Sequence, residues 1–117
     1  MAEHDPDLIT GYHAHIYYDA ATRETAARVR EALDQRFDVE LGRWRDQPVG
    51  PHPRSMYQVA FPTREFERLI PWLALNRDGL VALVHPLTGD DYGDHASYAL
   101  WLGEKLELNL AVLKEAS

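Results

Sequence analysis

GYHAHIYYD, residues 11–19, is the stretch that decides the fold of this chain. Side chains on a β-strand point alternately to its two faces, so the stretch predicts a strand over residues 11–18 with two different faces. One face would carry Tyr12, Ala14, Ile16 and Tyr18. The other would carry two imidazoles and a phenol, from His13, His15 and Tyr17. We expect helices to cover the first face, and the second face holds the candidate functional groups.

Composition limits the classes of function. The 117 residues suffice for one domain with a core, but not for two. The net charge is −7 and the basic residues are scattered, which argues against a nucleic-acid surface because phosphate binding needs clustered Lys and Arg. The chain has no cysteine, so disulfides and thiolate metal sites are excluded. It has neither a long apolar run nor a signal peptide at its N-terminus, so we expect a cytoplasmic protein that does not span a membrane.

Two amphipathic helices are predicted from apolar residues spaced three and four apart. The first follows Asp19 or Thr22 as its N-cap and buries Ala26, Val29, Leu33 and Phe37. The second runs from Thr63 to about residue 76, buries Phe66, Leu69, Ile70 and Leu73, and should be kinked or split by Pro71. Further strands are predicted over residues 39–45, 55–61, 80–85 and 97–102.

The remaining segments read as connections. Residues 1–10 are a polar lead-in, and residues 46–54 form a stiff proline-rich loop that contains His52. Residues 86–95 are a loop rich in Gly and Asp that ends at His95, and residues 106–112 suggest one more extended segment.

The order of elements is β-α-β-β-α-β, which predicts an α+β, ferredoxin-like split β-α-β domain with an antiparallel sheet over residues 11–117. Within it, we expect the first and third strands to lie side by side and parallel, with the fourth antiparallel beside the first. This topology would bring His13, His15, His52 and His85 to one end of the sheet. A single strand-edge histidine is more often a surface residue, whereas four converging imidazoles suit iron, zinc, copper or nickel.

Several motifs then occur in a fixed order: HAHIYYD, PVGPHP, SMYQVAF and WLALNRDGLVALVHPLTGDDYGDH, followed by ALWLG. In order and spacing they resemble the DOPA 4,5-dioxygenase family of small bacterial and fungal proteins, over about residues 11–103. The resemblance implies a ferredoxin-like fold that pairs through its sheet into a dimeric α+β barrel. It also implies extradiol cleavage of DOPA or a related catechol by O₂ at a histidine-bound metal.

The resemblance implies His15, His52 and His85 as metal ligands, with His13 next. Fe(II) is the expected ion, with zinc or another divalent ion as the alternative. His13 and His95 are expected as catalytic groups that transfer protons, with a lid residue as the alternative for His95. Tyr17, Tyr57 and Trp44 would line the ring pocket unless they only pack the sheet, and Arg45 or Arg54 would hold a substrate carboxylate.

Two positions depart from the family. Arg45 stands where many members have a histidine, and Gln58 stands where some have a glutamate. If a metal carboxylate is needed, the candidates are Glu40, Asp91 and Asp94.

Two other hypotheses remain open. One is a metal-free oxidase or isomerase of phenolic substrates, in which the histidines act as acids and bases. The other is a non-enzymatic dimeric binding module, because an open face with Tyr17 and Trp44 would be a large apolar patch for a monomer.

Overall fold

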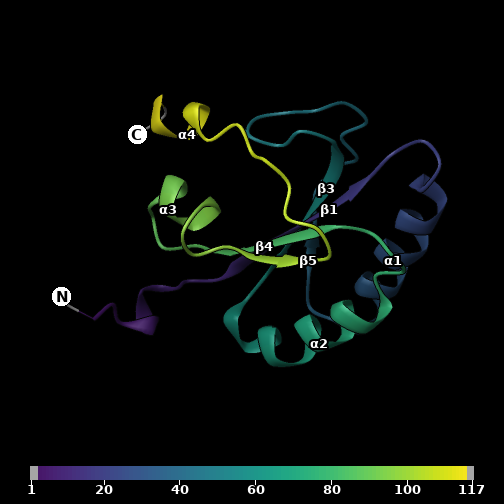
Figure 1. Cartoon of the computed structure of the whole chain (residues 1–117). Helices are drawn as coiled ribbons and strands as arrows, with labels where there is room; N and C mark the ends of the chain where they lie inside the picture. Colours follow the sequence, from purple (N-terminus) through teal and green to yellow (C-terminus); the bar gives the residue numbers. More distant parts are fainter. Residues whose placement is uncertain (1–2, 116–117) are drawn as a thin grey trace.

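A five-stranded antiparallel sheet forms the centre of the structure, a computed structural model that describes residues 3–115. The strands lie in the order β2-β3-β1-β4-β5 (Figure 1). Their bounds are β1 Tyr12–Tyr18, β2 Glu40–Leu41, β3 Ser55–Phe61, β4 Ala82–Pro86 and β5 Leu100–Leu102. The first four strands have the order of the predicted ferredoxin-like fold, and β5 extends the sheet beyond β4.

Two helices, α1 (Arg23–Arg36) and α2 (Phe66–Asn76), cover one face of this sheet (Figure 1). The core between them and the sheet contains Ala14, Ile16 and Tyr18 of β1, as the alternation predicts. Helix α2 continues through Pro71, so it is not split there, and a 3₁₀ turn precedes it at Thr63–Glu65.

The predicted parallel pairing of the first and third strands is wrong. Strand β1 pairs with β3 in the antiparallel sense, with Tyr12 opposite Phe61 and Tyr18 opposite Ser55. The reason is that a crossover through α1 makes β2 run in the same direction as β1, and the next strand reverses that direction. The start of β3 therefore lies at the far end of β1 from His13. Strand β4 is antiparallel to β1, as predicted, with His13 opposite His85.

The second predicted strand is much shorter than expected. Only Glu40–Leu41 form β2, and the chain pairs with β3 again at a single bridge between Arg45 and Met56. Three residues, 42–44, lie opposite two on β3, which is the pattern of a β-bulge. The extra residue lets Trp44 pack in the helix-side core, while Arg45 shares the other face with its partner Met56.

The other face of the sheet is not open. The loop 46–54, the short helices α3 (Asp91–His95) and α4 (Ala111–Glu115), and the segment between β5 and α4 lie over it (Figure 1). Leu106 of that segment packs with Tyr17, Met56 and Leu83 in a second apolar cluster. Tyr17 is consequently 1% exposed, which removes the exposed patch on which the binding-module hypothesis depended.

Two other predictions also need correction, one of a loop and one of an extended segment. Residues 86–95 do not stay a loop, because Asp90 caps α3 by accepting a hydrogen bond from the Gly93 amide at 3.0 Å. Residues 106–112 do not form a strand, and their last two begin α4. In the lead-in, Pro6–Leu8 form a 3₁₀ turn, and residues 1–2 lie outside the described part. No described helix is long and apolar enough to cross a bilayer.

Candidate metal centre

Five histidines gather on the face of the sheet opposite α1 and α2. His13 and His15 project from β1, His85 from β4, His52 from the loop 46–54 and His95 from the last residue of α3. The ring centroids of His15 and His52 lie 4.2 Å apart, and those of His85 and His95 lie 4.0 Å apart. His15, His52 and His85 are all buried. We call this group the histidine cluster.

Two sets of three imidazoles in the cluster have nitrogen atoms close enough to share one ion. One set is His13, His15 and His85, and the other is His15, His52 and His95, with the ligand atoms of each set within 4.8 Å of one another. His15 belongs to both. The predicted ligands His15, His52 and His85 are thus brought together but divided between the two sets, and the division into ligands and proton-transfer groups stays a prediction.

Backbone carbonyls fix the orientation of two of these rings. His85 Nδ1 lies 2.9 Å from the Pro86 carbonyl oxygen, and His95 Nδ1 lies 2.7 Å from the Asp91 carbonyl oxygen. Each Nδ1–H therefore donates to its carbonyl, and each Nε2 carries a lone pair, which in His85 faces Nε2 of His15 at 3.1 Å. A metal-binding histidine commonly has this arrangement.

His15 has a buried ring nitrogen that no other group satisfies. Its Nε2 lies 3.1 Å from Nε2 of His85, while its Nδ1 is buried without a hydrogen-bond partner. Burying an unpaired polar nitrogen costs about 1–3 kcal/mol. The fold bears this cost at the central position of the cluster.

Tyr17 continues the cluster along β1. Its hydroxyl lies 2.7 Å from Nδ1 of His52, and its ring stacks at 6.2 Å on Trp101 of β5. Burial raises the pKa of the Tyr17 phenol, so the hydroxyl stays protonated and shares a single hydrogen with Nδ1 of the neutral His52 ring. Tyr17 thus lies against His52, and its expected role in lining the pocket of the substrate ring stays a prediction.

Burial keeps the inner imidazoles neutral. It lowers the pKa of His52 to about 4 and that of His85 to about 3, and in both cases the nearby His95 adds to the effect. Burial, followed by His52 and His85, holds the pKa of His15 well below its usual value. A neutral imidazole is the form that binds a metal ion. The cluster is thus ready to hold a cation at neutral pH.

A cavity of about 260 Å³ leads to this cluster from the loop side. His15 and His52 form part of its wall, and Arg43, Arg45 and Gln58 form another part. The two positions that depart from the family, Arg45 and Gln58, therefore face the same cavity. Gln58 is the direct cross-strand partner of His15.

Two predicted substrate-binding residues lie elsewhere. Tyr57 pairs with Ile16, so it is on the helix-covered face, where its hydroxyl donates to the Ala26 carbonyl at 2.8 Å. The expected contact of Tyr57 with a ligand at the cluster does not fit this position, and its ring packs on Trp44 instead. Arg54 lines a separate hollow and forms an ion pair with Glu104.

No carboxylate belongs to either candidate metal set within residues 3–115. Asp94 is buried, but its two oxygens accept hydrogen bonds from the amide and hydroxyl of Thr88, which anchors the turn before α3. Glu40 and Asp91 are exposed. The candidate donors are therefore imidazoles alone.

Sequence reasoning missed two parts of this site. Arg43 was not singled out, since its place depends on the bulge, and the cover supplied by residues 104–110 was missed as well. The Asn109 amide donates to the Pro51 carbonyl at 2.9 Å, which ties the cover to the loop that carries His52. The alternating Leu106 and Leu108 were the available signal, but they pack as a cover and not as a strand.

Comparison with models of protein families finds a match over most of the chain. The model of the Dopa 4,5-dioxygenase family matches residues 12–112, which include the whole histidine cluster. The chain belongs to the Dopa 4,5-dioxygenase family. Membership of this family indicates that the protein is an enzyme with a dioxygenase-type function. It also confirms the family resemblance seen in the sequence motifs.

Individual relatives agree with this family. A DOPA 4,5-dioxygenase of Amanita muscaria is 38% identical over 90% of this chain, which spans about half of that protein's length. An uncharacterised 21.2 kDa protein of Botryotinia fuckeliana is 36% identical over 94% of this chain and 67% of its own. The crystal structure of a protein of Nostoc punctiforme, proposed to be a dioxygenase, is 57% identical, with a TM-score of 0.97 over 98% of this chain and all of its own. Proteins named as dioxygenases are thus similar to this chain in sequence and, for the Nostoc protein, in fold.

Proposed function

We propose that this protein is an extradiol dioxygenase that opens the ring of DOPA or a related catechol with O₂ at a metal held by the histidine cluster. The observation that carries the proposal is the buried group of neutral imidazoles around His15. Such a group is costly for folding, because three polar rings are removed from water. A bound cation offsets that cost.

The residues present fit a metal ion. Two nitrogen ligands about 2.1 Å from one ion and at right angles to each other are about 3 Å apart, close to the 3.1 Å between Nε2 of His15 and Nε2 of His85. In both rings the ligand atom would be Nε2, and Nδ1 of His85 would keep its hydrogen bond to the Pro86 carbonyl oxygen. We propose His15 and His85 as two ligands, with His13 or His52 as the third. Fe(II) is the ion proposed, because imidazole suits iron and the substrates include O₂.

The metal would act as a Lewis acid toward the catechol oxygens and as a template for the two substrates. The remaining residues would bind the substrate and exclude water from the cluster. The loop 46–54 and residues 104–110 cover the cluster, and Tyr17 holds the His52 ring in place through its hydroxyl. His13 and His95 are the less buried imidazoles of the cluster, so they are the groups proposed to transfer the catechol protons.

Oxygen consumption tests the proposal. Protein loaded anaerobically with Fe(II) should consume O₂ when DOPA or a simple catechol is added, with a yellow ring-cleaved product. The variants His15→Ala and His85→Ala should lose both iron and O₂ uptake, whereas Gln35→Ala serves as a control because Gln35 is exposed on α1, away from the cluster. Comparing His13→Ala with His52→Ala then identifies the third ligand by loss of iron.

The outcome also separates the rival hypotheses. Turnover of a phenolic substrate by protein that holds no iron would favour the metal-free enzyme. Neither iron binding nor turnover, with oligomerisation unchanged in His15→Ala, would favour a binding module.

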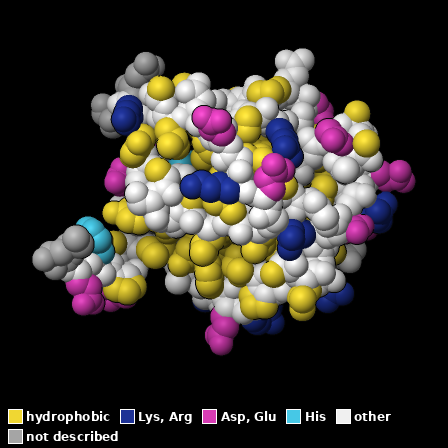
Figure 2. Space-filling view, in the orientation of Figure 1, with side chains coloured by type: hydrophobic (Ala, Val, Ile, Leu, Met, Phe, Trp, Pro, Cys, Tyr) yellow, Lys and Arg dark blue, Asp and Glu magenta, His cyan; other side chains and the backbone are white. Residues whose placement is uncertain are grey.

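A homodimer is part of the proposal and has its own surface. Leu8, Tyr98 and Leu100 are exposed apolar residues around a hollow of about 560 Å³ beside the free edge of β5. Figure 2 shows hydrophobic side chains gathered there, between the N-terminal segment and the body of the protein. A molar mass measured by light scattering should be that of two chains, and Leu100→Lys should reduce it to one.

A further inference from the structure

We propose that Arg45, with Arg43 beside it, binds a carboxylate group of the substrate at the mouth of the cavity that leads to His15 and His52. The inference rests on the proposed function and narrows its substrate to catechols with an anionic side chain. It chooses between the two arginines suggested by the sequence, Arg45 and Arg54.

The cavity has two chemically different parts. The buried residues His15 and His52 line one part of it, and the exposed residues Arg43 and Arg45 line another. Its volume of about 260 Å³ is below the range of about 300–1,000 Å³ that is usual for drug-sized ligands. A single aromatic ring with a short substituent suits this volume. The ring would face the imidazoles and the substituent would face the arginines.

The bulge after β2 places Arg45 at this cavity. Residue 45 pairs with Met56, and Met56 belongs to the cluster on the histidine side of the sheet. Without the extra residue in the bulge, residue 45 would fall on the helix-covered face, where Trp44 now packs. Bulges beside binding sites commonly redirect a side chain in this way.

Arg43 and Arg45 differ from the other arginines of the chain. The chain has ten arginines, and eight have an ion pair, a hydrogen bond to an acceptor or a contact with an aromatic ring. These are Arg23, Arg28, Arg30, Arg36, Arg54, Arg64, Arg68 and Arg77. For Arg43 and Arg45 the part of the chain that the structure describes supplies no side-chain partner. Their guanidinium donors are free, and that fork matches a carboxylate.

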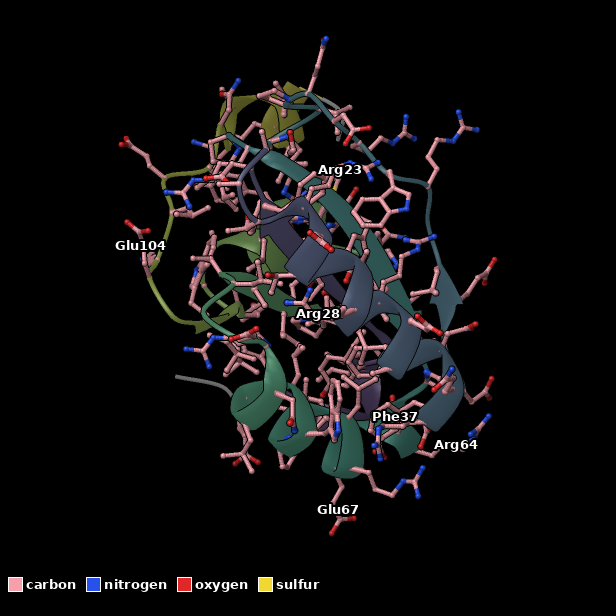
Figure 3. All side chains as sticks on the ribbon, turned by 90° about the vertical axis from the view of Figure 1, so that its right-hand side faces the viewer. Arg23, Arg28, Phe37, Arg64, Glu67 and Glu104 are labelled. Carbon is pink, nitrogen blue, oxygen red and sulfur yellow. The ribbon has the colours of Figure 1, made fainter. Side chains whose placement is uncertain are left out.

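The acidic residue next in the chain does not neutralise Arg45. Asp46 accepts a hydrogen bond from Arg23 Nε at 2.9 Å and another from the Tyr18 hydroxyl at 2.6 Å. Arg54, in contrast, is 3.3 Å from the Glu104 carboxylate, which lies on the segment after β5 (Figure 3). In a chain of net charge −7, two free arginines at one cavity make a local positive site that attracts an anion.

A matched pair of ligands tests the proposal. The acid is 3,4-dihydroxyphenylacetate, and the neutral control is its amide, which has the same ring and nearly the same shape. Anaerobic calorimetric titration in the presence of Fe(II) should show the wild type binding the acid about ten- to a hundredfold more tightly than the amide, as expected for charge-assisted hydrogen bonds. Arg45→Gln should bring the two affinities to within about twofold, and Arg43→Gln should reduce the difference in part.

Arg28→Gln is the matched control. It removes the same charge from the outer surface of α1 (Figure 3), and it should leave the preference for the acid unchanged. A preference that survives in Arg45→Gln, or disappears in Arg54→Gln instead, would overturn the proposal, as would equal affinities or no binding in the wild type. Circular dichroism establishes that each variant is folded.

The same ligands separate this inference from the proposed function. Ring cleavage with equal kcat/KM for acid and amide would contradict carboxylate recognition and leave the dioxygenase function intact. Preferential binding of the acid that depends on Arg45, without any ring cleavage, would support carboxylate recognition and contradict the dioxygenase function.

Discussion

Both faces of strand β1 are buried, but burial has opposite effects on stability at the two faces. On one face, Ala14 and Ile16 are fully buried among apolar neighbours under α1 and α2. On the other, His15 is 3% exposed and keeps a ring nitrogen without a partner. Burial stabilises the fold on the first face and costs free energy on the second. Neighbouring residues of one strand therefore differ in role. Those that face α1 and α2 stabilise the fold, and those that face away from these helices form the candidate metal centre.

The largest expected effect is the loss of iron and O₂ uptake when an imidazole of the histidine cluster is removed. The comparison is with truncation of the neighbouring residue on the helix-covered face. His85→Ala should lower iron retention and O₂ uptake at least about a hundredfold, because it deletes a proposed ligand with a carbonyl-fixed ring. Val84→Ala is the control at the adjacent, equally buried position, and it should retain iron. Iron content after gel filtration measures both. Equal iron loss in the two variants would remove the contrast between the faces.

The reciprocal change affects stability. Ile16→Ala should lower the free energy of unfolding by about 2–5 kcal/mol, because it leaves a cavity in a fully packed core. Urea denaturation measures the change. Folded Ile16→Ala at low temperature should still bind iron, and a specific loss of iron there would mean that the two faces are coupled.

Lowering the pH should decrease the free energy of unfolding of the metal-free protein, because the buried histidines take up protons more readily in the unfolded chain. The folded-state pKa is about 4 for His52 and about 3 for His85, below the usual 6.5 of the unfolded chain. The unfolded chain therefore binds more protons, and stability is fully present above about pH 6.5 and lost as the pH falls toward those values. By pH 5 the loss should be on the order of 2 kcal/mol for each buried histidine. Urea midpoints at pH 7.5 and pH 5 measure it, and a flat profile would contradict the neutral cluster.

The smallest expected effect is a change in stability close to zero. His15→Leu should change the free energy of unfolding by less than about 1 kcal/mol, because it removes a buried nitrogen that has no partner but also takes the hydrogen-bond partner from Nε2 of His85. The same variant should hold no iron. A loss of stability in the metal-free form would show that the His15 ring contributes to the fold in its own right.

The sequence predicts the two faces of β1 well, since a period of two is a strong signal over seven residues. It predicts His13, His15 and His85 together because β4 is antiparallel to β1, as the fold requires. It predicts His52 at the wrong end of the sheet, since β3 is antiparallel to β1. His52 reaches the cluster all the same, because its loop folds back over the face.

Other parts of the site depend on contacts that local patterns do not encode. Helix α3 has five residues, too few for a helical period, and only the capping Asp90 signals it. Tyr57 was expected near the substrate because the register of β3 was open, and its pairing with Ile16 decides the face. The bulge that turns Arg45 toward the cavity is one residue in length and has no apolar pattern of its own.

The hydrogen bond between Asn109 and Pro51 has a consequence for how the protein is made. A nascent chain leaves the ribosome with its N-terminus first. The five histidines of the cluster, His13, His15, His52, His85 and His95, therefore emerge before residue 109. The loop that carries His52 receives its tie only when that residue has left the exit tunnel. This hydrogen bond, and the cover that residues 104–110 provide, can therefore form only late in synthesis, after the five imidazoles of the cluster have emerged.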